Sequence, residues 1–269
     1  MGSGPELGTG MMTRDETRRH RALSVVGASI ALVLLSTLPV HAQPDFQLWA
    51  NFKFEWDKSH QTTIAVDAEP KVLVWAPAGD PGWATLDVTP SIEYKRGPWF
   101  DAIGEFLVGR TKQTDDLDST ELTPRIGFRL HLLSNLRDDL HKERQPRRRL
   151  VLRDLLRFEY RNLTYSTDKP DSHTVRFRNR IETLWPVNRH KITDDGAAYL
   201  MADWEFFIPL DDPSERYANR QRIRGGVGYR RSLAWRFEAL YVWNRSRNTI
   251  DEPFSTTDHA IDLTMKRVW

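Results

Sequence analysis

The 269-residue chain contains no cysteine, which excludes disulfides, thiolate metal sites, a cysteine nucleophile and a lipid-modified N-terminal cysteine. It also lacks an excess of either charge. Its 39 Lys and Arg residues face 37 Asp and Glu residues, a formal net charge of +2 that argues against a nucleic-acid-binding surface. After residue 42 no apolar run is long enough for a membrane helix. Two classes remain, a soluble β protein and a membrane β-barrel, because a barrel needs no continuous apolar run.

Residues 13–42 have the composition of a cleaved secretory signal. A stretch with four arginines precedes an apolar run from Ala22 to Leu38, and the run ends at the small-x-small pattern Val40-His41-Ala42. We therefore expect residues 1–42 to be an N-terminal extension and signal peptide that is removed on export. Residues 43–269 would then form one domain, integral to the bacterial outer membrane.

Period-2 alternation recurs through almost all of 43–269. In the first segment Leu48, Phe52 and Phe54 share one face, while Lys53 and Glu55 lie on the other. The alternating segments span about 9–13 residues, as tilted bilayer-crossing strands do, whereas soluble strands average nearer 5–6. The predicted strands are 46–56, 61–69, 71–76, 83–95, 99–111, 122–133, 150–164, 173–185, 197–209, 219–230, 234–246 and 257–269.

The pattern predicts an all-β fold, a transmembrane antiparallel up-and-down β-barrel of about 12 strands with both termini in the periplasm. Segment 71–76 is short and could merge with 61–69, which would give eleven strands. An even count brings both ends to one side, as in bacterial barrels, so we expect twelve. Tight turns at 96–98 and 231–233 would face the periplasm, together with 134–149 and 186–196, and longer polar loops would face outward.

Aromatic residues gather near the predicted strand ends, as in the girdles at membrane interfaces. Trp99, Trp185 and Trp235 fall at periplasmic ends under this topology, whereas Trp56 falls at an outer end. Trp269 closes an alternating last strand, which is similar to the signal read by the barrel assembly machinery. The expected partners are thus this machinery, outer-membrane lipid and lipopolysaccharide.

Four sequence elements together resemble the bacterial family catalogued as domain of unknown function 2490, whose members are predicted to be outer-membrane barrels. They are Phe46-Gln47-Leu48-Trp49, Glu121-Leu122-Thr123-Pro124-Arg125, Arg176-Phe177-Arg178-Asn179-Arg180, and the run from Asp203 and Glu205 through Asn219-Arg220 to Gly226-Val227-Gly228-Tyr229. The resemblance covers essentially all of 43–269. It implies a fold and a location but no activity.

The inward face is where a function would reside, and its predicted residues are charged. The lumen-lining candidates are Asp67, Glu69, Asp87, Glu93, Asp101, Glu105, Arg125, Arg129, Arg157, Arg161, Arg176, Arg178, Arg180, Asp203 and Glu205. Acidic members dominate 61–69, 83–95 and 99–111, and basic members dominate 122–133, 150–164 and 173–185. Two opposed walls would set a field across a narrow charge-selective channel for a small solute. The alternative is that cross-strand ion pairs act as structural struts.

Other classes have weaker sequence support. A lipid-modifying enzyme needs a nucleophile and a base, and the candidates are Ser59-His60, Asp171-Ser172-His173 and Asp258-His259 near predicted outer loops. No GxSxG or HExxH motif is present, so we assign no catalytic residue. Asp115, Asp116 and Asp118 could hold a divalent ion, but a solvated acidic loop is the simpler interpretation, and no metal or cofactor is predicted. A soluble periplasmic barrel that carries a lipid remains a third alternative.

Overall fold

The structure is a computed structural model, and it describes residues 45–76, 82–97, 99–114, 117–133, 150–211, 219–247, 254 and 256–269. The predicted signal peptide, Asp115, Asp116 and the 134–149 segment lie outside these residues. No helix in the described ranges is long and apolar enough to cross a membrane.

The described part of the chain forms eleven β-strands and no helix. They are β1 (Asp45–Asp57), β2 (Thr62–Trp75), β3 (Trp83–Lys95), β4 (Phe100–Gln113), β5 (Ser119–His131), β6 (Val151–Tyr165), β7 (Ser172–Pro186), β8 (Ala197–Pro209), β9 (Arg220–Ser232), β10 (Trp235–Ser246) and β11 (Thr256–Val268). Each is 12 to 15 residues long, well beyond the usual strand of a soluble protein.

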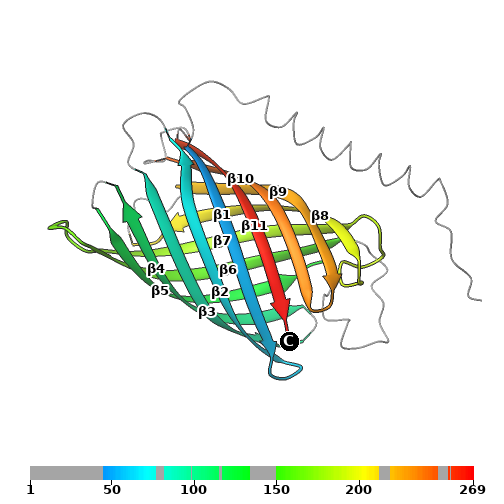
Figure 1. The fold of residues 1–269 in the computed structure, drawn as a ribbon. Coiled ribbons are helices and arrows are strands. Elements are labelled where there is room, and N and C mark those ends of the chain that lie inside the picture. Colours follow the sequence, from blue (N-terminus) through cyan, green and yellow to red (C-terminus); the bar gives the residue numbers. More distant parts are fainter. Residues whose placement is uncertain are drawn as a thin grey trace, which may run out of the picture. The chain divides into compact units, whose positions relative to one another are not determined.

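The strands close into one barrel in which each strand pairs with its sequence neighbours (Figure 1). All consecutive pairs are antiparallel, and a parallel pairing of β1 with β11 closes the barrel. At this seam Asp45 lies beside Asp258 and Glu55 beside Val268, and the Trp269 amide donates to the Glu55 carbonyl at 3.0 Å. The all-β barrel predicted from the alternation is therefore confirmed.

The strand count of twelve is wrong, because 61–69 and 71–76 are one strand. β2 runs without a break through Pro70, which has no amide to donate. Pro70 pairs with Leu86 of β3, whereas the ladder to β1 passes from Lys71 directly to Ala68. The missing donor thus interrupts the pairing with one neighbour and leaves the strand intact.

The odd count places the two ends of the barrel at opposite mouths. We name these the Asp45 mouth, where β1 begins, and the Trp269 mouth, where β11 ends. The expectation that both ends share one side fails, since β1 and β11 run in the same direction. Trp56 and Trp269, expected at opposite ends of the barrel, lie at the same mouth, because their rings stack with centroids 5.2 Å apart.

The two faces of the barrel differ in chemistry. Outward positions carry exposed apolar side chains, among them Ile126, 59% exposed, and Val227, 55% exposed. Inward positions alternate with these and carry most of the charged groups, yet several are almost completely buried. The interior therefore holds the polar side chains that could carry a function.

Candidate functional site

The ladder registers place every predicted lumen-lining residue on the interior face of the barrel. Glu105 is opposite Arg125, Asp101 opposite Arg129, and Arg180 opposite Glu205. The same face includes Asp67, Glu69, Asp87, Glu93, Arg157, Arg161, Arg176, Arg178 and Asp203. Period-2 alternation brings these residues together because the alternation follows the pleat of the strand.

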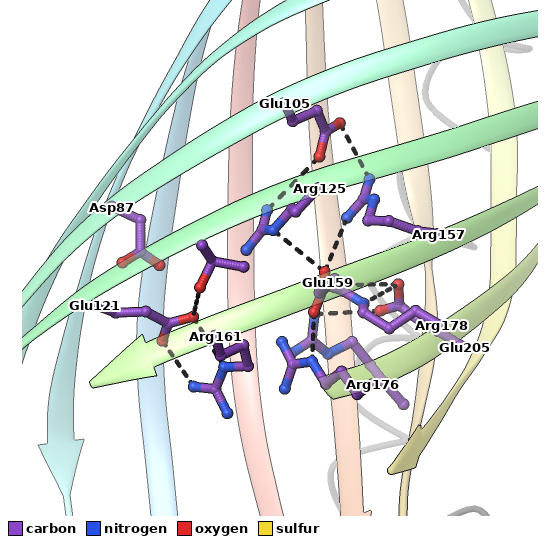
Figure 2. A network of polar contacts seen from close by, with 12 residues as sticks. Asp87, Glu105, Glu121, Arg125, Arg157, Glu159, Arg161, Arg176, Arg178 and Glu205 are labelled. Carbon is purple, nitrogen blue, oxygen red and sulfur yellow. Dashed lines mark hydrogen bonds and ion pairs between the residues drawn. The ribbon is translucent and has the colours of Figure 1, made fainter. Parts of the chain in front are cut away.

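Glu159 of β6 is the centre of the interior ion-pair network (Figure 2). Its carboxylate accepts from Arg178 at 2.8 Å and lies 3.2 Å from Arg125 Nε and 3.8 Å from Arg157 Nη1. Arg176 also donates to it through Nε. Glu159 is 1% exposed, so one fully buried carboxylate meets four guanidinium groups.

Two further glutamates extend this network around the barrel wall. Glu105 of β4 lies 3.3 Å from Arg157 and 3.7 Å from Arg125. Glu205 of β8 accepts two bonds from Arg178, the shorter at 2.7 Å, and a bond from Arg222 at 3.4 Å. Strands β4 to β9 are thereby joined through side chains as well as through backbone ladders.

The aromatic ring of Phe207 packs against three arginines of this network. The guanidinium carbons of Arg176, Arg178 and Arg222 lie 5.2, 4.6 and 5.4 Å from the centre of its ring. Guanidinium groups stack favourably on aromatic faces, so Phe207 holds three like charges close together while Glu159 and Glu205 neutralise them.

Smaller groups of ion pairs lie elsewhere on the interior face. Asp203 accepts from Arg224 at 3.0 Å, and Glu93 accepts from Arg129 at 2.6 Å. On the side of β1, the Lys53 amino group lies 3.1 Å from Asp67. Lys71 in β2 bridges Glu69 and Asp87, at 3.1 and 2.8 Å.

These contacts do not form the two opposed walls, one acidic and one basic, that the sequence suggests. Glu121, Glu159 and Glu182 stand among the arginines of β5 to β7, and lysines stand among the acids of β1 to β3. Opposite charges are therefore interleaved at ion-pair distance, which is the arrangement expected of struts between strands.

Several central residues were missed by the sequence reasoning, chiefly Glu159, Glu182, Arg222 and Arg224. Glu159 falls on the same two-residue period as Arg157 and Arg161 and could have been found by extending that period. Arg222 and Arg224 likewise alternate with Ile223. The two-residue period alone therefore marks these positions as inward-facing.

An apolar cluster occupies the interior near the Trp269 mouth. Ile192, from the connection between β7 and β8, is 4% exposed and packs with Val151, Leu184, Tyr199, Met201 and Leu240. All five partners lie on interior positions of β6, β7, β8 and β10. A segment outside the strands thus places a side chain inside the barrel.

Two of the three histidines considered as catalytic bases contact other groups. His173 Nδ1 is 2.8 Å from the Asn162 side-chain oxygen, and His259 Nδ1 contacts the Tyr241 hydroxyl. Ser59 accepts from the backbone amides of Gln61 and Thr62 and so forms the turn after β1. In the described ranges no group of three or more His, Asp or Glu side chains has the arrangement of a metal site.

Fold and interior together define a closed β-barrel with an apolar exterior and an ion-paired core. Residues 46–254 match the family described as "Protein of unknown function (DUF2490)", and the chain belongs to this family. No curated protein matches the chain. The family resemblance seen in the four sequence elements is thereby confirmed, and the assignment of a function rests on the barrel itself.

Proposed function

We propose that the protein is an integral barrel of the bacterial outer membrane with a closed, ion-paired interior. The observation that carries the proposal is the distribution of exposure over the two faces. Ile126 and Val227 are more than half exposed on the outside, while Glu159 and Glu205 are each 1% exposed inside. A water-soluble protein would leave a large apolar exterior unfavourably hydrated, whereas hydrocarbon is the matching solvent for it.

Exposed aromatic side chains at the Trp269 mouth support the same proposal. Tyr94, Trp99 and Trp185 lie at or next to strand ends there, Tyr229 lies three residues before the end of β9, and Trp269 itself is exposed. Such rings suit the headgroup region of a bilayer. We infer that this mouth faces the periplasm, with Trp269 presented to the assembly machinery, and that residues 13–42 direct export.

The packing of the interior favours a closed barrel over an open pore. A water-filled channel would leave charged wall residues hydrated, yet Asp203, Glu159 and Glu205 side chains are at most 2% exposed. Their partners are other wall residues within 4 Å, so we propose that the charges hold the wall together and do not line a wide solute path.

Two measurements test this proposal. Folded membrane barrels resist detergent, so unboiled protein should migrate differently from boiled protein, and it should require detergent for extraction from membranes. In planar bilayers the folded protein should give no steady open-pore conductance. Compact monomeric protein in the aqueous fraction would contradict membrane integration, and stable conductance from folded protein would contradict the closed interior.

A further inference from the structure

The Asp45 mouth contains a cavity of about 460 Å³. The ion-pair network neutralises only part of the positive charge of the arginines that line this cavity. Its lining includes Arg161, Thr174, Arg176, Phe207, Arg220 and Arg247, from β6, β7 and β8, the start of β9 and the residue after β10. The volume is in the range of small-molecule sites. Among the described lining residues, four carry guanidinium groups and one, Asp211, carries a carboxylate.

The four arginines differ in the ion pairs and hydrogen bonds that they already make with carboxylates of the barrel wall. Arg161 makes two bonds to Glu121, at 2.9 and 2.7 Å, and Arg176 is bonded to Glu159 through Nε. Nε is one of five N–H donors on a guanidinium group, so Arg176 keeps hydrogen-bonding capacity. Glu159 is shared with three other arginines and neutralises Arg176 only in part.

Arg220 is the least neutralised of the four. Its side chain is exposed, and no carboxylate of the described residues lies within ion-pair distance of it. Asp258 of β11 attracts its charge electrostatically from beyond that distance. Arg247 stacks on Phe254 with its guanidinium carbon 4.7 Å from the ring centre. Thr174 adds a buried hydroxyl that has no hydrogen-bond partner in the described ranges.

We infer that this cavity binds a phosphate group. Tetrahedral phosphate oxygens can accept from several guanidinium groups at once, and the arginine fork matches phosphate geometry. Phe207 gives the cavity an apolar wall beside the charged groups, which suits a phosphate attached to a small organic group. Free phosphate esters and lipid headgroups share this chemistry, and competition by phosphatidic acid distinguishes them.

The direct test is isothermal titration calorimetry of inorganic pyrophosphate into the folded barrel in a non-ionic detergent. Arg220→Gln and Arg247→Gln should each weaken binding about tenfold, because each removes a charge-assisted contact. The matched control is Arg110→Gln in β4, since Arg110 is exposed near the same mouth, bonds Thr120 and Asp118 and does not line the cavity. It should bind like the wild type. Adding phosphatidic acid to the micelles should compete only if the site accepts a lipid headgroup.

The inference is overturned if folded wild-type protein binds no pyrophosphate at millimolar concentration. It is also overturned if Arg110→Gln weakens binding as much as Arg220→Gln, which would indicate unspecific attraction. Folding of each variant is checked by gel mobility before titration. Because binding is measured on folded protein in detergent, failure here leaves the proposed closed membrane barrel standing.

Discussion

Glu159 carries one negative charge and contacts four arginines, so its loss affects more than one ion pair. Glu159→Gln would leave Arg125, Arg157, Arg176 and Arg178 close together without the carboxylate between them. Removing one partner of a buried ionic group costs about 3–5 kcal/mol, so we expect a loss of that order in the free energy of unfolding. Denaturant titration of the barrel in detergent measures it.

Glu121→Gln is the matched control for that prediction. Among the described residues Glu121 forms an ion pair only with Arg161, beside a hydrogen bond from Thr123, and the side chains of the pair are partly exposed, at 19% and 24%. Pairs with access to water contribute about 0–1 kcal/mol, so this variant should lose much less stability. Equal losses in the two variants would mean that Glu159 is not the centre of the network.

Gly228 of β9 is required by a close approach of Tyr199. A Cβ atom at Gly228 would lie 2.1 Å from the Tyr199 ring, whose hydroxyl donates to Glu238 at 2.5 Å. Gly228→Ala should therefore displace the ring, weaken this bond and cost about 1–3 kcal/mol of stability. Gly225→Ala is the control, because nothing lies within 4 Å of a Cβ there. The difference in unfolding midpoints between the two variants measures the effect.

At the scale of the element, alternation predicted most strands correctly, and proline explains the main error. Pro90 and Pro124 sit inside β3 and β5 as Pro70 sits inside β2. Near each, the ladder to one neighbour skips two residues: Thr89 and Pro90 toward β4, and Thr123 and Pro124 toward β6. A single sequence does not reveal with which neighbour a strand loses hydrogen bonds at a proline. The sequence around Pro70 therefore could not distinguish a local interruption of one ladder from a turn between two strands.

The connection between β7 and β8 has a role in interior packing that the sequence did not reveal. It was predicted only as a periplasmic connection, yet Ile192 enters the barrel. Ile192→Ala should lower the free energy of unfolding by about 2–5 kcal/mol through the cavity it leaves. Ile126→Ala on the outer face of β5 removes an exposed side chain of the same kind and should cost far less. Similar thermal midpoints for the two variants would contradict the packed position of Ile192.

At the scale of the whole molecule, the parallel seam makes a topological prediction that the absence of cysteine makes easy to test. Lys58 and Arg96 lie at the Trp269 mouth, and Asp171 lies before β7 at the Asp45 mouth. If the Trp269 mouth faces the periplasm, as proposed, an impermeant maleimide added to intact cells should label Asp171→Cys but neither Lys58→Cys nor Arg96→Cys.

The twelve-strand topology gives a different labelling result. It would place Lys58 with Asp171, so strong labelling of Lys58→Cys alongside Asp171→Cys would contradict the seam. Reaction of all three variants after detergent lysis serves as the control for thiol accessibility. The seam itself could not be predicted from alternation, because the period fixes faces but not the number of strands.

The same seam limits how the chain could be rearranged. In a barrel with an even number of strands the first and last residues adjoin, and a few added residues can join them to make a circular permutant. Here Asp45 and Trp269 are separated by the length of β1, 13 residues or about 43 Å at roughly 3.3 Å per residue. A joining linker would need about a dozen extended residues laid along the outer face or threaded past the side chains of the interior, so this barrel should resist permutation where an even-stranded barrel would tolerate it.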